Sequence, residues 1–279
     1  MKWKNRRASS NVEDRRRVKM GRGAKGGGLA TIVIALVAMY FGIDPQIATQ
    51  IAGGLSSGQQ QTTEYTPTAA ENELAQFTAV VLADTEDVWH PLFRQMGGTY
   101  QEPKLVMFTG AVNSGCGAAS SAMGPFYCPT DRKVYIDLGF YNDLKSRHNA
   151  PGDFAQAYVI AHEVGHHIQN LMGISDQVFQ ARQRMSKTDG NALSVKLELQ
   201  ADCLAGVWAN HTQRAKQVLE QGDIEEALTA ASAIGDDRLQ KQATGRIQPE
   251  SFTHGTSEQR VQWFKRGMRD GTFDGCNTF

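Results

Sequence analysis

Two histidines four residues apart, His162 and His166, stand in an otherwise apolar stretch of this chain and restrict what that stretch can become. Residues 154–172 place apolar side chains at helical spacing, and Gly173 follows directly, so the sequence predicts a helix there. On a helix, side chains four residues apart project from one face and can reach the same point. Imidazoles inside an apolar helix are costly unless a partner satisfies them. A shared metal ion would satisfy both.

Glu163 completes an H-E-x-x-H motif and lies about 100° around the helix from His162. In that position a carboxylate adjoins the metal without binding it, and can take a proton from an attacking water and later deliver it to a leaving amine. The motif therefore predicts a zinc site with Glu163 as general base. His167 points away from His166 and is expected to pack or to support the site rather than to bind the metal.

A catalytic zinc ion usually takes three protein ligands, and the motif supplies two. The long metzincin form of the motif is absent, because Met172 stands where that form has a ligand. Glu198 and Asp202 are four residues apart in a second predicted helix with apolar surroundings, which resembles the gluzincin pattern. That resemblance implies Glu198 as third ligand and Asp202 as the acid that fixes the tautomer of His162. Other sources of the third ligand remain open: Asp202 itself, His211 and His254.

Two further roles in a peptidase need residues that the motif does not provide. His254 and Tyr135 are candidates to stabilise a transition state, although either residue type is equally common in a structural role. The predicted strand over residues 133–138 could bind a peptide as an added strand, or could be a core strand.

Charge is distributed unevenly along the chain. Residues 1–25 hold ten Lys and Arg against two acidic residues, which leaves 19 basic and 27 acidic residues to the rest. A basic tail can bind nucleic acid, but this one has no recognisable reading module, so no nucleic-acid partner is expected.

Residues 26–43 carry no charge and would form about 27 Å of helix, close to the thickness of a bilayer core. Basic residues ahead of this run predict a single span with residues 1–25 as a cytoplasmic tail, and with the rest beyond the bacterial cytoplasmic membrane, on its periplasmic or extracellular side. A cleaved signal peptide and a buried helix are the alternatives.

The polar residues 44–70 predict a flexible linker, so the expected domain covers residues 71–279. Apolar periodicity and turn signals predict helices over residues 71–96, 154–172, 175–185, 191–216 and 224–234. A capping-box pattern at Thr256 and Gln259 predicts a last helix. Strands are expected over residues 104–109 and 133–138. The fold class is therefore α+β, mostly helical with a small sheet.

The chain has four cysteines and no C-x-x-C pair. Outside the cytoplasm they would form two disulfides, of three possible pairings; Cys116–Cys128 would close a Gly- and Ser-rich loop and leave Cys203–Cys276. Inside the cytoplasm they would stay reduced.

These residues together resemble the bacterial putative neutral zinc metallopeptidase family. The resemblance runs over the whole length and is carried by SGCGAASSAMGPFYCP (114–129), AHEVGHHIQN (161–170), ELQADCLAGVWA (198–209), AIGDDRLQK (233–241) and HGTSEQRVQWFKRG (254–267). It implies a membrane-attached, zincin-like metalloendopeptidase with one zinc ion per chain, bound by His162, His166 and Glu198, with Glu163 as catalytic base. A peptide or protein is the expected substrate. The alternative is a binding protein that keeps the zinc but has lost catalysis.

Overall fold

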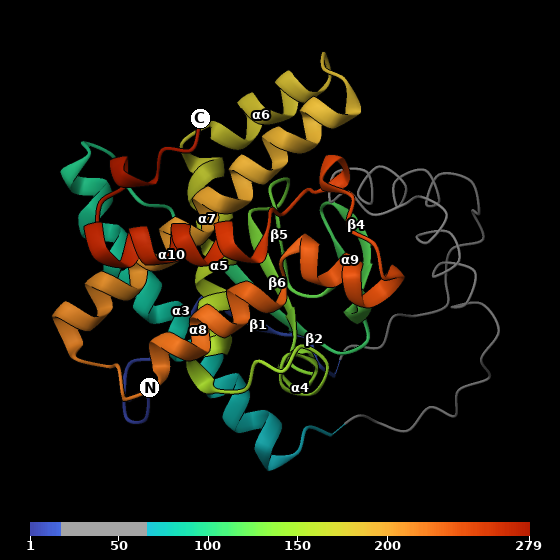
Figure 1. Cartoon of the computed structure of the whole chain (residues 1–279). Coiled ribbons are helices and arrows are strands. Elements are labelled where there is room, and N and C mark those ends of the chain that lie inside the picture. The colour runs from blue at the N-terminus through green and yellow to red at the C-terminus, as the bar shows by residue number, and fades with distance from the viewer. Residues whose placement is uncertain (18–65) are drawn as a thin grey trace.

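The computed structural model describes residues 1–17 and 66–279 (Figure 1). The longer helices are α3 (Ala69–Gln95), α5 (Asp153–Leu171), α7 (Lys187–Lys216), α8 (Asp223–Ala233) and α10 (Ser257–Asp270). Shorter helices are α4 (Phe140–Ser146), α6 (Ile174–Arg182), α9 (Asp236–Thr244) and the 3-10 turns η1 (Ser121–Met123), η2 (Pro249–Ser251) and η3 (Asp274–Cys276). The expected α+β class, mostly helical with a small sheet, is confirmed.

The sheet has four strands in the order β1 (Val12–Asp14), β2 (Lys104–Phe108), β6 (Lys133–Asp137) and β5 (Phe126–Cys128). β1, β2 and β6 are parallel, whereas β5 runs antiparallel to β6 at the sheet edge. A separate hairpin joins β3 (Ala111–Ser114) to β4 (Gly117–Ser120). Because β6 is paired on both sides, the segment considered as a peptide-binding edge is instead a central strand. β5 is the edge on that side.

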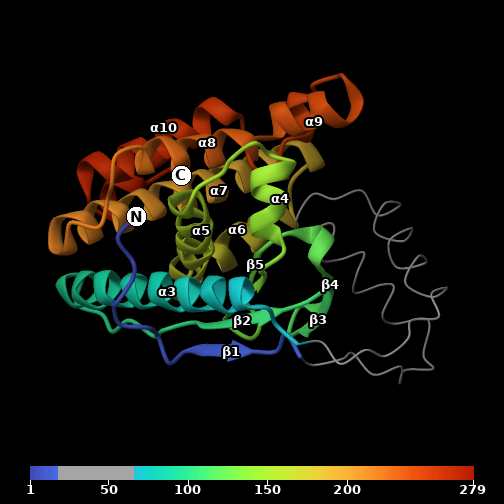
Figure 2. The ribbon, with the colours of Figure 1, turned by 90° about the horizontal axis from the view of Figure 1, so that it is seen from below.

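Helices cover the sheet in successive layers (Figure 2). α3 lies along the sheet, α5 follows, and α7, α8 and α10 lie on the far side of α5. One apolar core joins β2, β6, α3, α5, α7 and α8, with Trp89, Tyr158 and Trp208 almost completely buried in it. The helix that carries both histidines is therefore the centre of the domain rather than a surface element.

α7 and α10 cross with their backbones in contact, and Gly267 permits this. A Cβ atom on Gly267 would lie 1.9 Å from the Cys203 carbonyl oxygen, so only glycine fits there. This close approach brings residues from the start of α10 to the face of α7 that carries Asp202.

Residues 1–17 pack against the same body, although the sequence suggested a tail separate from it. β1 pairs with β2, and the Arg15 amide donates to the Met107 carbonyl at 2.8 Å. Basic side chains of the segment meet acids on α3: Arg6 pairs with Asp84, and Arg7 Nη1 lies 2.8 Å from Glu86 Oε2. Part of the excess positive charge near the N-terminus thus binds the acidic face of α3.

The helices expected from periodicity are present with ends shifted by a few residues, and the capping box at Thr256 is confirmed. The expected anchor, residues 26–43, and most of the linker lie outside the described residues. None of the helices within residues 1–17 and 66–279 has the length and apolar composition that a membrane crossing needs.

Both expected disulfides are present. Cys116–Cys128 ties the loop after β3 to β5, and Cys203–Cys276 ties α7 to the C-terminal tail. All four cysteines form disulfides, so the structure is that of the oxidised chain.

Candidate metal centre

A cavity of about 240 Å³ opens between α5, α7 and β5. His162, Glu163, His166, Glu198 and His254 all line it. Its other wall is largely apolar and is formed by Met123, Pro125, Phe126, Phe140, Val159, Ile234 and Leu239. The cavity thus combines a polar floor with a hydrophobic wall next to the edge strand β5.

Three side chains converge on the floor of this cavity. The Nε2 atoms of His162 and His166 are 3.2 Å apart, and Glu198 places carboxylate oxygens 3.2 Å from the first and 3.5 Å from the second. A tetrahedral zinc ion with bonds of about 2.0–2.1 Å holds neighbouring ligand atoms about 3.3 Å apart. Two imidazole nitrogens and a carboxylate at these separations fit zinc, and three ligands leave a fourth position open.

Gly165 helps to bring Glu198 close to the two histidines. A Cβ at this position would lie 3.0 Å from the Ala201 carbonyl oxygen on α7, tighter than an ordinary contact. The glycine lets α5 approach the α7 turn that carries Glu198.

Asp202 holds the far side of His162. Its Oδ1 lies 2.8 Å from His162 Nδ1, so Nδ1 carries the hydrogen and Nε2 faces the cavity. Arg260 donates from Nε to Oδ2 at 2.8 Å, and the Tyr158 hydroxyl donates to Oδ1 at 2.5 Å. Burial by itself would raise the pKa of Asp202, but Arg260 and His162 lower it to about 2. The carboxylate therefore stays ionised.

Neighbouring charged side chains also shift the pKa values of the candidate ligands His162 and Glu198. Burial opposes the imidazolium, yet Asp202 and Glu198 raise the pKa of His162 to about 10. Burial likewise opposes the Glu198 carboxylate, and His166 and His254 hold its pKa well below the usual value. A cavity with these charges favours a cation, whether a proton or a metal.

Glu163 lies between the two histidines in sequence and is 8% exposed. Burial raises its pKa, with His166 and His162 opposing the rise. Within the residues that the structure describes, its carboxylate has no hydrogen-bonding partner. A carboxylate that is buried, unpartnered and of raised pKa is suited to accept a proton near neutral pH.

His254 belongs to the cavity, and Asp236 explains its position. Asp236 Oδ2 accepts backbone N–H groups of Thr253, His254 and Gly255 at 2.7, 2.6 and 3.1 Å, while Oδ1 lies 3.2 Å from His254 Nδ1. Burial would lower the pKa of His254, but Glu198 and Asp236 raise it. The imidazole is thus presented to the cavity as a hydrogen-bond donor.

The other candidates lie elsewhere. The Tyr135 hydroxyl donates to Asp131 at 2.6 Å, and its ring stacks on Phe126, so it is not part of the cavity lining. His211 Nε2 donates to the Gly271 carbonyl at 2.8 Å. His167 is completely buried, between the Tyr127 hydroxyl and the Gln101 carbonyl, and fixes α5 to β5.

Sequence reasoning did not assign roles to Arg260, Tyr158, Asp236 or Gln169. Arg260 and Asp236 lie in segments that the family resemblance contains, but nothing in their spacing connects them to the motif. Their roles depend on long-range helix packing.

A second acidic group, Asp153, Asp223 and Glu226, lies at the other end of α5. The Met1 ammonium is 2.6 Å from Asp153 and 3.3 Å from Asp223. The acids therefore already have a cation partner.

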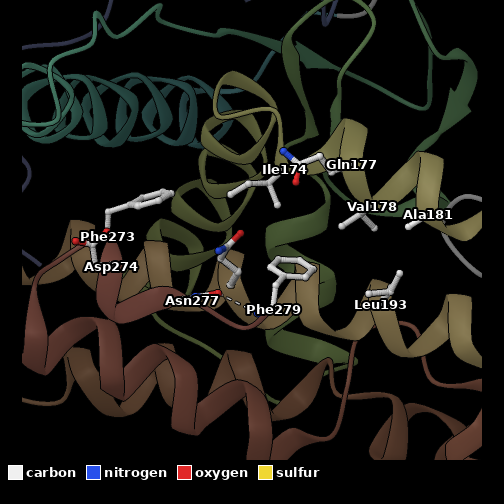
Figure 3. A pocket seen from close by; sticks show the side chains of 10 residues that line it. Ile174, Gln177, Val178, Ala181, Leu193, Phe273, Asp274, Asn277 and Phe279 are labelled. Atoms are coloured by element: carbon white, nitrogen blue, oxygen red, sulfur yellow. Dashed lines mark hydrogen bonds between the residues drawn. The ribbon is translucent and has the colours of Figure 1, made fainter.

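Another cavity, of about 600 Å³, lies between α6, α7 and the C-terminal tail (Figure 3). Val178, Leu193 and Phe279 line it. It is larger than the His162 cavity but has no converging ligand set, so its size does not mark it as the centre of chemistry.

Two histidines and a glutamate at zinc-ligand separations, with a glutamate base beside them, define a zinc-peptidase type of site. The chain belongs to the family described as "Putative neutral zinc metallopeptidase", whose model matches residues 1–279. It is 54% identical over 288 residues to "Uncharacterized protein YpfJ" of Escherichia coli strain K12, covering 100% of this chain and 99% of the relative. It is 39% identical over 262 residues to "Uncharacterized protein Rv2575" of Mycobacterium tuberculosis strain H37Rv, covering 87% and 85%. No solved structure matches the chain.

Proposed function

We propose that this protein is a zinc-dependent metalloendopeptidase with one zinc ion per chain, bound by His162, His166 and Glu198. The observation that carries the proposal is the convergence of two imidazole nitrogens and one carboxylate, with nitrogen–nitrogen and nitrogen–oxygen distances of 3.2 to 3.5 Å, beside the unpartnered Glu163 carboxylate on the same cavity. Zinc, when bound, would polarise the scissile carbonyl and make an attacking water more acidic.

The other steps of catalysis are assigned to side chains of the cavity. Glu163 accepts the proton of the attacking water and passes it to the leaving amine. His254, held by Asp236, donates a hydrogen bond to the oxygen on which negative charge develops. Asp202 keeps His162 in the tautomer whose free nitrogen faces the cavity.

The substrate we propose is a peptide bound in extended form along β5. This strand is an edge of the sheet, so its outer side can accept a further strand, and Phe126 from β5 lines the cavity. The apolar wall beside it, with Phe140 and Leu239, suits a bulky apolar side chain next to the cleaved bond.

If the protein were a zinc-containing binding protein without catalysis, Glu163 would have no role. A buried carboxylate without a partner costs stability, and a site used only for structure would gain from an apolar residue there. Catalysis accounts for this residue, and structure alone does not.

We further propose that the domain acts outside the cytoplasm and is attached to the cytoplasmic membrane through residues 26–43. Two disulfides support an oxidising compartment, and the uncharged run supports attachment.

Full-chain protein tests the activity, since residues 1–17 are part of the fold. Zinc-loaded wild type should cleave members of a diverse peptide library, and chelation should abolish cleavage. Glu163→Gln should bind zinc as tightly as wild type but cleave at least about 10²-fold more slowly. Full activity in this variant would contradict the mechanism. A zinc-loaded wild type that cleaves nothing would favour the binding protein.

A further inference from the structure

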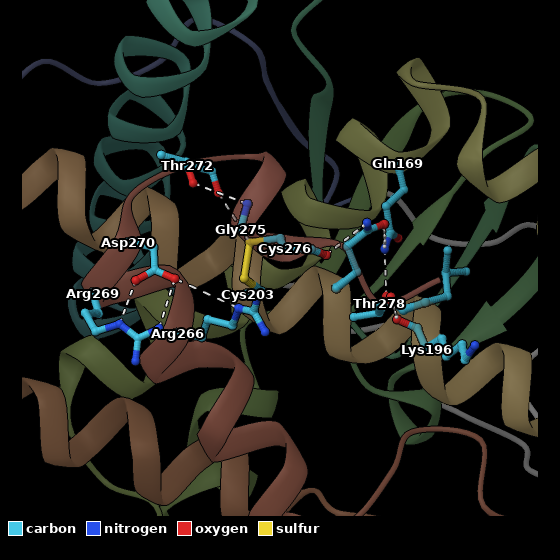
Figure 4. The surroundings of a disulfide bond; sticks show 12 residues. Gln169, Lys196, Cys203, Arg266, Arg269, Asp270, Thr272, Gly275, Cys276 and Thr278 are labelled. Atoms are coloured by element: carbon cyan, nitrogen blue, oxygen red, sulfur yellow. Dashed lines mark hydrogen bonds and ion pairs between the residues drawn. A yellow bond between two sulfur atoms is a disulfide. The ribbon is translucent and has the colours of Figure 1, made fainter.

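A line of hydrogen bonds connects His166 to the C-terminal tail, and Figure 4 shows its part between Gln169 and Cys276. Gln169 Oε1 lies 2.9 Å from His166 Nδ1, and Gln169 Nε2 lies 3.1 Å from Gln200 Oε1. Gln200 Nε2 in turn lies 3.1 Å from the Cys276 carbonyl oxygen. Both glutamines are buried, with exposures of 0% and 3%, so water does not substitute for these contacts.

Two backbone carbonyl oxygens, of Cys276 and Leu197, fix the direction of the bonds in this line. A carbonyl oxygen only accepts, so Gln200 must turn its NH₂ group toward Cys276 and its Oε1 toward Gln169. Gln169 must then turn its own NH₂ group toward Gln200, and the Leu197 carbonyl, 2.6 Å away, demands the same orientation. The Gln169 oxygen is left facing His166, so Nδ1 of His166 carries the hydrogen. Its Nε2 lone pair is thereby directed into the cavity.

The Cys203–Cys276 disulfide keeps the Cys276 carbonyl in place. Cys203 follows Gln200 by three residues on α7, so the bond ties the tail to the same part of the helix from which Gln200 projects. Figure 4 shows this disulfide beside Gln169 and the tail residue Thr278. Thr278 adds a bond of 2.8 Å to the Lys196 carbonyl, but this contact does not involve either glutamine.

The two histidines are therefore oriented by different means. His162 has a carboxylate behind it, whereas His166 has a neutral amide whose orientation depends on its neighbours. We propose that Gln169, held by the Leu197 carbonyl and, through Gln200, by the disulfide-anchored tail, fixes the tautomer of His166 and so sets the affinity of the site for zinc. This inference rests on the proposed function for its metal, but the tautomer can be measured without one.

The first test is the tautomer in zinc-free, full-chain protein at pH 8, read from ¹⁵N NMR of the labelled imidazoles and assigned with His166→Asn. Wild type should show His166 with hydrogen on Nδ1. Gln169→Met removes the acceptor behind Nδ1 while nearly keeping the shape of the side chain, so it should give a mixture of tautomers. Gln169→Asn, whose shorter side chain withdraws the amide from Nδ1, is the second variant if the Met variant does not fold.

The second test is zinc affinity, measured by competition with a chelator. Loss of a group that orients a ligand typically weakens metal binding by about 10–100-fold, and we expect about 10-fold for Gln169→Met. Two controls should stay at the wild-type value: Gln177→Met, which makes the same change at an exposed position on α6, and Thr278→Val, which alters the tail.

A folded Gln169→Met that keeps the wild-type tautomer and zinc affinity would overturn the proposal. Failure of the proposed function would look different. In that case wild type would bind zinc and cleave nothing, or would bind no zinc at all, while the tautomer would still distinguish the variants from wild type.

Discussion

Arg260 and Asp202 form a buried ion pair directly behind the candidate zinc ligand His162. The guanidinium donates from Nε to Oδ2 at 2.8 Å and from Nη2 to Oδ1 at 2.9 Å, and the two side chains are 2% and 0% exposed. Arg260 comes from α10 and Asp202 from α7, so the crossing at Gly267 is what brings them together. Helix packing and the orientation of His162 therefore depend on the same pair.

Removing one member of this pair should be far more damaging than removing an exposed charge. Arg260→Met leaves the Asp202 charge buried without its main partner, which typically costs about 3–5 kcal/mol. Urea unfolding of the zinc-free protein would measure the loss. Arg266→Met on the same helix is the control, since Arg266 is 47% exposed and its change should cost less than about 1 kcal/mol. Equal losses in the two variants would contradict the role assigned to the pair.

His254 should matter for turnover and not for zinc binding. Removal of one transition-state donor typically costs about 10²–10³-fold in kcat, so His254→Ala should lose that much while its zinc content and KM stay near wild type. Asp236→Asn removes the negative charge that raises the pKa of His254, so protonated His254 should be lost at a lower pH. The alkaline limb of the kcat/KM profile should then move toward acid. Loss of zinc in His254→Ala would assign this residue to metal binding instead.

The core of the site could be predicted because its members share a helical period. His162 and His166 are four apart on α5, and Glu198 and Asp202 are four apart on α7, so each pair already shares a face. Only the contact between the two helices had to be supplied by the fold. Arg260 and Asp236 have no such spacing, since they reach the site from α10 and from the start of α9.

The strands of the sheet were harder to predict from the sequence than the helices. β1 and β5 have only three residues each, too few for alternation to show, and β1 lies in a segment whose composition is mainly basic. The same basic composition also concealed the strand within residues 1–17. Positive charge next to an apolar run is typical of membrane topology, but here Arg6 and Arg7 meet acids on α3. A single sequence does not show which acids a basic segment will find.

Acid should weaken the fold through His167. Burial lowers the pKa of His167 to about 4, below its ordinary value of 6.5, so the unfolded chain binds a proton that the folded chain does not. The contribution is present above pH 6.5 and is lost as the pH falls toward 4, by about 3 kcal/mol in total. His167→Asn keeps an acceptor for the Tyr127 hydroxyl and should flatten this part of the curve of unfolding free energy against pH.

The packing of residues 1–17 makes a prediction about membrane topology. One crossing between residues 17 and 66 would place β1 and β2 on opposite sides of the membrane, whereas the structure pairs them in one sheet. A docked β1 and a single span are therefore mutually exclusive. Undocking would also break the ion pairs of Arg6 with Asp84 and of Arg7 with Glu86, whose carboxylates are buried. We expect the docked arrangement, with both parts of the chain outside the cytoplasm and with residues 26–43 attached to the membrane other than by a single crossing.

Single cysteines at exposed positions would decide between these arrangements, since the four native cysteines are in disulfides. Lys4→Cys reports on the N-terminal segment and Lys265→Cys on the far part of the domain; both side chains are exposed. In intact cells that make the protein, a membrane-impermeant maleimide should label both positions or neither, and permeabilised cells should label both. Labelling at residue 265 with protection at residue 4 would mean that β1 leaves the sheet and the chain crosses the membrane once. In that case Arg6→Gln and Arg7→Gln should cost the membrane-bound protein no stability, whereas in the docked arrangement each leaves a buried carboxylate of α3 without its guanidinium and should lower the unfolding temperature.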